Sequence, residues 1–443
     1  MLTRLDRISH RASADPKAVF NNLFSLLTEE LLWEAWFGLK SGKAPGVDGV
    51  TLEEYGENLR GNLQDLLSRL HRGAYRPKPS LRKLIPKGNG KTRPLGIASL
   101  EDKLVQRAIV LILERIYEVD FYGFSYGYRP GKSCHEALAT LGGIIATRRV
   151  NFISDADIKG FFDNVSHERL VELLKIRIAD RKLLRLIARF LKAGVMIDGR
   201  LEATEDGVPQ GASLSPLLAN VYLHYVLDKW FERDVNPRMR GECYMIRFAD
   251  DFICCFEHER DAERYQAVLP KRLGRYSLAV AEDKTKLIRF GRFARGYHQS
   301  RGDGAPATFD FLGFTHYCGT SRAGKFKLKR KTSGKKLRLK LRELRLWFHH
   351  QLTEPVGTMW ETLNQKLRGH FQYYGINDNW PLLMAYREHA RLMAKRHLSR
   401  RSQKSYVGWS EFNRFCELHP LASPKRLTDL IALGRELSSR RDK

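Results

Sequence analysis

The sequence predicts an α+β fold followed by a helical and strongly basic C-terminal region. The central part of the chain, about residues 150 to 317, mixes helical patterns with short strands rich in β-branched and aromatic residues. After Tyr317 a one-signed run of basic residues leads into amphipathic helical spacing. With 443 residues, 43% of them apolar, the chain is long enough for two or three domains with cores of their own.

The region before the centre is expected to be mainly helical. Apolar residues at helical spacing over residues 15–44 indicate two helices that end at the Pro-Gly of KAPGVDGVT. A helix is expected from Leu52 to Leu70. Two short strands around IPKGNGKTRPLGI then predict a hairpin, because an Asn-Gly step favours a tight turn. A helix over 101–118 follows.

In the centre, the strand-forming segments are separated by apolar stretches with helical spacing. Helices are expected over 167–178 and 212–231. The expected strands lie near 152–158, 244–249, 252–256 and 309–317. Their mixture with helices is the basis of the α+β assignment.

Charge points to a polyanionic partner. The chain has 77 Lys and Arg against 50 Asp and Glu, a formal charge of +27, which favours nucleic acid or an acidic membrane surface. Residues 321–350 hold twelve Lys or Arg and one acid, Glu343. In KFKLKRK the lysines recur at every second position, so they share one strand face while Phe326 and Leu328 take the other. Farther on, Tyr373 and Tyr374 fit either base stacking or a helical core.

Two classes of location are disfavoured. No apolar run approaches the roughly 20 residues of a membrane-spanning helix, and the first residues lack the core of a signal peptide. The six cysteines form no C-x-x-C pair, which argues against a zinc cluster and against a disulfide framework. The expected compartment is therefore a reducing cytoplasm.

The segment YMIRFADDFICCF places Asp250 and Asp251 in the middle of a strand-like pattern. Adjacent carboxylates repel, and burying them without a partner costs several kcal/mol or more. A Mg²⁺ site explains them, because Mg²⁺ takes oxygen ligands. A further carboxylate is available on FISDADIKGFFDNVS, from Asp155, Asp157 or Asp163. The competing interpretation is that the Asp pair forms the turn of a solvated hairpin.

RFADDF resembles the catalytic motif of reverse transcriptases. DADIKGFFDNVSH, GVPQGASLSPLLANVYLH, IPKGNGKTRPLGI, GFSYGYRPGKSCHEAL, LAVAEDKTKL and FDFLGF resemble that family's other blocks, in the same order. Together with KAPGVDGVT upstream and LRGHFQYYGI downstream, these motifs are similar to those of the bacterial group II intron-encoded reverse transcriptases, or maturases. The resemblance implies a right-hand fold, with an N-terminal helical extension (1–40), fingers and antiparallel-sheet palm (41–320) and a helical, basic thumb or maturase domain (321–443).

The resemblance also implies roles for individual residues. It makes Asp157, Asp250 and Asp251 catalytic carboxylates, and with Ile158 the holders of two metal ions, Mg²⁺ or Mn²⁺. Lys284 matches a lysine that protonates the pyrophosphate leaving group. The implied nucleotide contacts are Lys87, Arg93, Phe162, Gln210 and Gly211, with Phe162 excluding ribonucleotides. The implied nucleic-acid contacts are Lys325, Lys327, Lys329 and Lys331. Arg129, in YRPGKS, fits either a contact with the template backbone or an ordinary surface turn at Pro-Gly.

The function implied is an RNA-directed DNA polymerase that copies RNA from a DNA or RNA primer with dNTPs, binds structured intron RNA, and assists splicing and mobility. The chain stops without a His- and Cys-rich endonuclease segment, so its primer is expected to come from elsewhere. Two other interpretations stay open. One is a domesticated relative in host repair or defence, and the other is an RNA-binding splicing factor whose polymerase is idle. An RNA replicase fits in outline, but Phe162 speaks against it.

Overall fold

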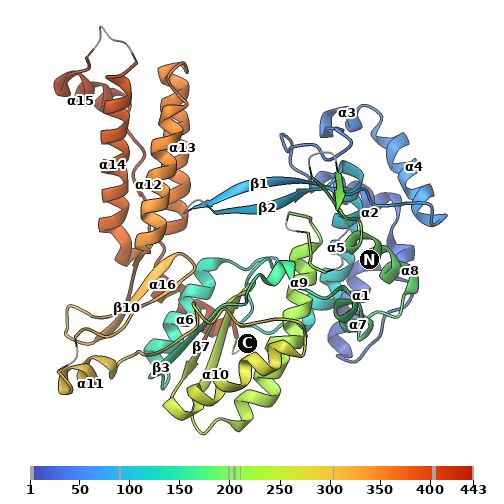
Figure 1. The fold of residues 1–443 in the computed structure, drawn as a ribbon, viewed down its shortest axis with the longest axis horizontal. Helices are drawn as coiled ribbons and strands as arrows, with labels where there is room; N and C mark the ends of the chain where they lie inside the picture. The colour runs from blue at the N-terminus through green and yellow to red at the C-terminus, as the bar shows by residue number, and fades with distance from the viewer. Residues whose placement is uncertain are drawn as a thin grey trace.

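The computed structural model describes residues 4–88, 91–197, 200–202, 206–209, 211–302, 304–401 and 406–441. Helices and three β-sheets are mixed along this part of the chain, which confirms the α+β class (Figure 1). The N-terminal elements are helical: α1 (Arg4–Ala14), a 3₁₀ turn (Leu23–Leu26), α2 (Glu29–Phe37), α3 (Leu52–Gly56) and α4 (Leu59–His71).

The single helix expected from Leu52 to Leu70 is two helices. A capping box between Thr51 and Glu54 starts α3, as the sequence pattern favours. The break falls between Gly56 and Asn58, both of which are poor helix formers. Helix α4 then buries Leu63, Leu66 and Leu70 on one face.

The β-hairpin is formed as predicted and belongs to a four-stranded sheet of order β2-β1-β4-β5. Strand β1 pairs antiparallel with β2 and parallel with β4. In Figure 1 the β1–β2 hairpin reaches from the N-terminal lobe across to the C-terminal helices. The strands of this sheet are β1 (Ser80–Gly88), β2 (Lys91–Ile97), β4 (Val195–Ile197) and β5 (Arg200–Glu202). The long buried helix α5 (Leu100–Asp120) follows β2.

The central sheet has the order β6-β7-β3-β8, and every pairing in it is antiparallel. Its strands are β3 (Phe152–Ala156), β6 (Cys243–Phe248), β7 (Asp251–Phe256) and β8 (Lys286–Arg289). The expected helix over 212–231 is α9 (Ser215–Leu223) continued by π-helical segments at His224–Asp228 and Phe231–Val235. The other helices of this region are α6 (Cys134–Thr147), a 3₁₀ turn (Phe161–Asp163), α7 (His167–Lys175), α8 (Arg181–Leu191), a 3₁₀ turn (Asn236–Arg238) and α10 (Glu259–Gly274).

The third sheet leads into the C-terminal helices, which form a column at one side of the molecule (Figure 1). Its strands follow α11 (Ala294–Ser300) and are β9 (Phe309–Phe311), β10 (Phe314–Thr320) and β11 (Phe326–Thr332). The column consists of α12 (Gly334–His349), α13 (Val356–Tyr374), a 3₁₀ turn (Asn377–Asn379), α14 (Trp380–Leu398) and α15 (Trp409–Leu418). The last helix, α16 (Leu430–Arg441), returns to pack on α6.

The central sheet separates two hydrophobic cores. Along β7, Phe252, Cys254 and Phe256 belong to the core shared with the N-terminal and central helices. The alternate residues Ile253 and Cys255 belong to the core shared with the third sheet and the C-terminal helices. This alternation follows from the period of two in a β-strand. We call these cores the first core and the second core.

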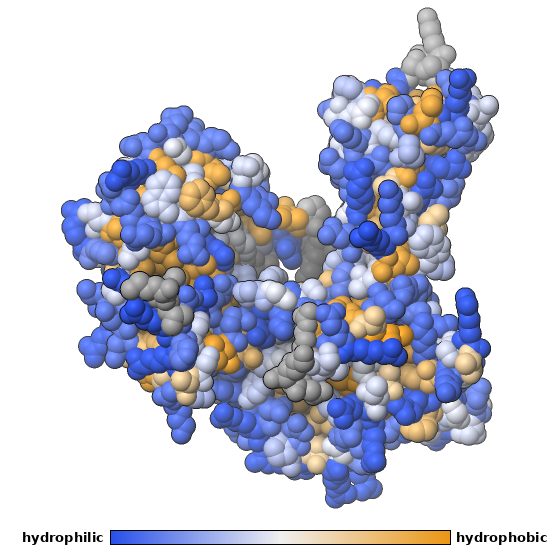
Figure 2. All heavy atoms as spheres, turned by 180° about the vertical axis from the view of Figure 1, so that it is seen from behind, coloured by the Kyte–Doolittle hydropathy of each residue, from blue (hydrophilic) through white to orange (hydrophobic). Residues whose placement is uncertain are grey.

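The surface seen in Figure 2 is mostly hydrophilic and is hollowed between the N-terminal lobe and the column of C-terminal helices. Within the described residues no helix combines the length and the apolar character needed to cross a bilayer.

Candidate active site

The fold brings Asp157 and Asp251 to the same edge of the central sheet. Asp157 directly follows β3, Asp250 lies in the two-residue turn between β6 and β7, and Asp251 begins β7. Because β3 and β7 run antiparallel with Ala156 opposite Phe252, the end of β3 lies beside the start of β7. Asp251 has the parity of Ile253, which faces the second core. Its carboxylate therefore points toward the C-terminal helices.

The carboxylates at this edge disturb one another. The pKa of Asp251 is raised to about 7, mainly by burial and in addition by the charges of Asp155, Asp250 and Asp157. Burial likewise raises the pKa of Asp155 to about 7, with Asp157 and Asp310 contributing. A cation placed among these groups removes the repulsion, so the edge is electrostatically suited to one.

Lys284 forms an ion pair with one of these carboxylates. Its ammonium group forms an ion pair with the Asp157 carboxylate, and this hydrogen bond is the main reason why the pKa of Lys284 lies above its ordinary value. The backbone N–H of Ala281 donates to the Asp157 carbonyl at 2.8 Å, which ties the segment carrying Lys284 to the end of β3. The geometry therefore places a protonated amine at the carboxylate edge.

The donor set suits a hard divalent ion, although the side chains are not gathered around a common point. In the part of the chain that the structure describes, no three His, Cys, Asp or Glu side chains are arranged to hold a metal. The Asp157 carboxylate is instead turned to Lys284. Ile158 is buried and apolar, so only its carbonyl oxygen is available as a ligand. Carboxylate and carbonyl oxygens are the ligands that Mg²⁺ and Mn²⁺ prefer.

A buried arginine holds the turn that carries Asp250. Arg247 and Asp228 are both 0% exposed, and they form two hydrogen bonds of 2.7 and 2.6 Å. The same guanidinium donates to the Asn220 side chain and to the Ala249 carbonyl, each at 2.9 Å. Because Ala249 precedes Asp250, this network fixes the backbone from which the Asp250 side chain extends.

The turn itself is a strained and crowded piece of backbone. Ala249 has a φ of 57°, a left-handed conformation that residues other than glycine seldom adopt. The neighbouring Gly127 lies so close that a Cβ on it would come within 2.2 Å of the Ala249 nitrogen. Only glycine is compatible with this approach, and the Gly127 carbonyl in turn accepts a hydrogen bond of 2.7 Å from Asn220.

A cavity of about 330 Å³ opens between the hairpin strand β2 and the central region. Phe162 lines it together with Pro94 and Gly96 of β2. Gly211 has a φ of 104°, and a Cβ there would lie 2.7 Å from the Gly96 carbonyl, so glycine is required where this loop meets β2. Arg93 is exposed on β2. The predicted contacts Lys87 and Gln210 lie outside the residues whose side chains are described.

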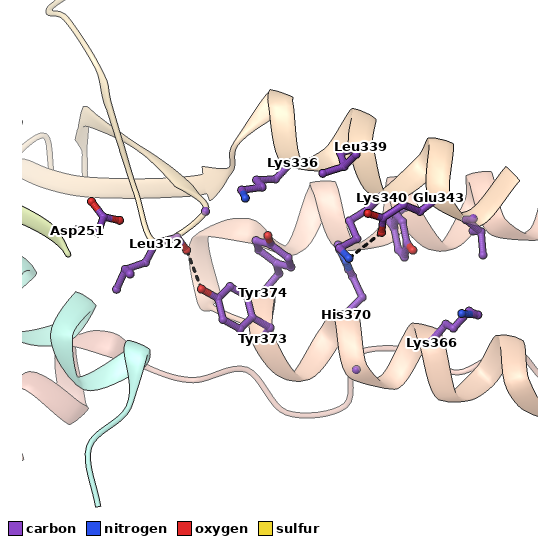
Figure 3. Close-up of a pocket in the computed structure, with 14 residues that line it drawn as sticks. Asp251, Leu312, Lys336, Leu339, Lys340, Glu343, Lys366, His370, Tyr373 and Tyr374 are labelled. Carbon is purple, nitrogen blue, oxygen red and sulfur yellow. Dashed lines mark hydrogen bonds and ion pairs between the residues drawn. The ribbon is translucent and has the colours of Figure 1, made fainter. Parts of the chain in front are cut away.

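A larger cavity of about 760 Å³ runs from Asp251 along the C-terminal helices. Figure 3 shows Asp251 and Leu312 at one end, with Lys336 and Lys340 on α12 and Lys366 on α13 farther along. Lys340 is paired with Glu343 at 2.8 Å. The sequence does not single out these three lysines, and the signal that it offers for them is the general excess of basic residues after Tyr317.

The comparison of this chain with known protein families agrees with the arrangement of aspartates at the sheet edge. The model of the reverse transcriptase (RNA-dependent DNA polymerase) family matches residues 85–316, which is more than half of the chain and includes the aspartates at the sheet edge. The chain belongs to the reverse transcriptase family. Members of this family generally use divalent metal ions, in keeping with the oxygen donors at the sheet edge.

Relatives of this reverse transcriptase family member include intron-encoded proteins. It is 35% identical over 306 residues to "Group II intron-encoded protein LtrA" of Lactococcus lactis, covering 66% of this chain and 50% of that one. It is 34% identical over 313 residues to "Protein YkfC" of Escherichia coli, covering 62% of this chain and 81% of that one. It is also 26% identical over 204 residues to "Nuclear intron maturase 1, mitochondrial" of Arabidopsis thaliana, covering 41% and 27%. The chain thus spans about half the length of the LtrA proteins it matches. These matches confirm the resemblance to group II intron-encoded reverse transcriptases.

One predicted nucleic-acid contact in this family member is wrong. The Arg129 side chain is 6% exposed and is paired with Glu118 at 3.0 Å. It also donates to the carbonyls of Tyr122 and Ser125, at 2.9 and 2.6 Å, and lies over the Phe121 ring. Its donors are used inside the protein, so it anchors the loop before α6 rather than a template backbone.

The row of lysines on β11 is only partly free for phosphate. As the alternation predicts, Phe326 and Leu328 pack on the second core. Lys327, however, pairs with Asp378 at 2.7 Å, and the Lys331 ammonium lies 5.6 Å from the centre of the Tyr317 ring. Lys325 is exposed, whereas Lys329 lies against Gly319. Nucleic-acid binding by these four residues stays a prediction.

Proposed function

We propose that the protein is an RNA-directed DNA polymerase that extends a DNA or RNA primer with dNTPs on an RNA template. The observation that carries this proposal is the convergence of Asp157 and Asp251 on one sheet edge, with Asp250 in the adjoining turn and Lys284 beside them. That edge opens through Asp251 into the larger cavity. Membership of the reverse transcriptase family gives the reaction class.

In this proposal Asp157, Asp250, Asp251 and the Ile158 carbonyl hold two Mg²⁺ ions, for which Mn²⁺ can substitute. Such ions, when bound, neutralise the charge that develops in the in-line displacement of pyrophosphate. The chain's own residues orient the reactants and move the proton. Lys284, whose pKa is raised beside Asp157, stays protonated at neutral pH and can donate a proton to the leaving pyrophosphate.

The two cavities divide the substrates between them. The nucleotide occupies the smaller one, where Phe162 meets the sugar and excludes a 2′-hydroxyl. Lys87, Arg93, Gln210 and Gly211 are proposed as its other contacts. The primer and template occupy the larger one, where Lys336, Lys340 and Lys366 meet the phosphate backbone. On this view the β1–β2 hairpin is part of the fingers, the central sheet is the palm, and α12–α15 are the thumb.

A second activity, assistance to intron splicing, is favoured by the names of the relatives. They include a "Group II intron-encoded protein" and a "Nuclear intron maturase". We propose structured intron RNA as the partner of this chain. Its charge of +27 suits binding to a folded polyanion independently of DNA synthesis.

Primer extension tests the polymerase. The experiment compares the native protein with an Asp250→Ala, Asp251→Ala variant on an RNA template with dNTPs and Mg²⁺. An Asp234→Ala variant is the control, since this carboxylate is exposed and pairs with Arg238 of the 3₁₀ turn before β6. Extension by the native and control proteins, lost in the double variant while RNA binding persists, is the expected result. Tight RNA binding without extension by any of the three would refute the polymerase and leave the splicing role.

A further inference from the structure

The turn between β9 and β10 lies against the carboxylate edge. Phe311 pairs with Phe314, so Leu312 and Gly313 form a two-residue turn, and both have positive φ, 50° and 79°. Glycine adopts this conformation freely, but for leucine it is uncommon and persists only where the surroundings hold it. Something must therefore fix the backbone of Leu312.

Both polar groups of the Leu312 backbone are held from outside the turn. Its N–H lies near enough to the Asp251 carboxylate to oppose the rise in pKa that burial causes there, and both residues line one end of the same cavity. Its carbonyl accepts one of 3.0 Å from the hydroxyl of Tyr373, on the last turn of α13 (Figure 3). A single peptide segment thus connects a proposed metal ligand with a helix that lines the nucleic-acid cavity.

Tyr373 itself is anchored independently of its contact with Leu312. Its ring stacks on Phe314 at a centroid distance of 6.1 Å. Its backbone carbonyl accepts a hydrogen bond of 2.8 Å from the His135 ring, at the start of α6. The Tyr373 hydroxyl also interacts with the Cys134 thiol. Removing only the hydroxyl therefore leaves the ring and the helix in place and ends its contacts with Leu312 and with Cys134.

We propose that Tyr373 is a positioning residue for Asp251 and acts through the backbone of Leu312. The hydroxyl holds the Leu312 peptide in the orientation that directs its N–H at the carboxylate, and so fixes the direction in which Asp251 presents its oxygens. Because α13 also lines the cavity proposed for primer and template, the seating of that helix on nucleic acid is transmitted to the metal-binding edge. The transmission to a metal site rests on the proposed function.

The test measures metal binding rather than synthesis alone. Mn²⁺ is titrated into the protein bound to primer and template, without nucleotide, and free Mn²⁺ is followed by its electron paramagnetic resonance signal. Tyr373→Phe is expected to weaken Mn²⁺ binding about fivefold, the effect of one ordinary hydrogen bond. The affinity for primer and template is expected to stay within about twofold of the native value, because the ring remains in place.

Tyr386→Phe is the matched control. It removes the same atom from another tyrosine that lines the same cavity, one whose ring stacks on His370 at 3.9 Å rather than touching the turn. It should leave Mn²⁺ affinity unchanged. Equal Mn²⁺ affinities of native and Tyr373→Phe proteins, or equal losses in both variants, would overturn the positioning role. A native protein that extends no primer, yet binds Mn²⁺ with an affinity dependent on Tyr373, would refute the polymerase and keep the positioning role.

Discussion

Replacing Asp228 with leucine is expected to destabilise the protein strongly, because it leaves the Arg247 guanidinium buried without its counter-ion. Both side chains are 0% exposed, and burial raises the pKa of Asp228 even though Arg247 faces it. Desolvation thus offsets much of the attraction within the pair, while breaking the pair from one side costs about 3–5 kcal/mol. That is a large share of a typical unfolding free energy of about 5–15 kcal/mol.

The measurement is urea unfolding of Asp228→Leu, of the double variant Arg247→Met, Asp228→Leu, and of Glu172→Ala. The double variant replaces the pair with apolar groups and should recover most of the lost stability. Glu172 pairs with Arg169 on the surface, with side chains 49% and 52% exposed, so its loss should cost below about 1 kcal/mol. Similar losses for Asp228→Leu and Glu172→Ala would refute the reasoning.

The double variant separates stability from activity. It removes the donor to the Ala249 carbonyl and to Asn220, so the turn that carries Asp250 loses its support. We expect the folded double variant to extend primers at least about tenfold more slowly, which corresponds to about 1.4 kcal/mol. A folded double variant with native extension rates would show that the network serves only the fold.

Three further outcomes follow from local geometry. Burial holds the pKa of His224 at about 2, so this ring stays neutral in the folded protein when the pH is lowered. In the unfolded chain it becomes protonated as the pH falls below its ordinary pKa of about 6.5. Between about pH 7.5 and pH 5 the native protein should therefore lose about 2 kcal/mol of unfolding free energy relative to His224→Phe; parallel pH curves of the two would contradict this. Changing Lys336 and Lys366 to alanine should reduce the slope of log affinity against log salt by about 2 in duplex-binding titrations, whereas an unchanged slope would remove them from the interface. Gly211→Ala should sharply raise the dNTP concentration for half-maximal extension, because its Cβ would lie 2.7 Å from the Gly96 carbonyl; a native value would show that the loop can move away.

The elements and the carboxylate edge follow from local patterns in the sequence. Alternation predicted the strands around Asp157 and Asp251, and the Asn-Gly step predicted the hairpin. The parity of Ile153 and Asp157 already placed them on one strand face. Their approach to Asp251 depends on β3 pairing with β7, a contact between segments about one hundred residues apart that no local pattern specifies.

The errors have a common physical origin. The Pro-Gly context of Arg129 indicates a surface turn, but whether a charged side chain is exposed depends on which acid the tertiary structure brings to it, here Glu118. Likewise the excess of basic residues after Tyr317 gave no means of choosing Lys336 and Lys366. Helix orientation alone decides which basic side chains face the cavity.

The catalytic edge lies where the two cores meet, and each core supports it through a different contact. Arg247 has the parity of Met245 in the first core and holds the Ala249 carbonyl. Tyr373 approaches from the second-core side and holds Leu312 beside Asp251. Since the two contacts share no atoms or partners, their effects on Mn²⁺ affinity should add within about 0.5 kcal/mol when Tyr373→Phe is combined with the Arg247→Met, Asp228→Leu pair. A larger deviation from additivity would mean that the turn and the edge of β7 respond as one unit, so that loosening either support releases both.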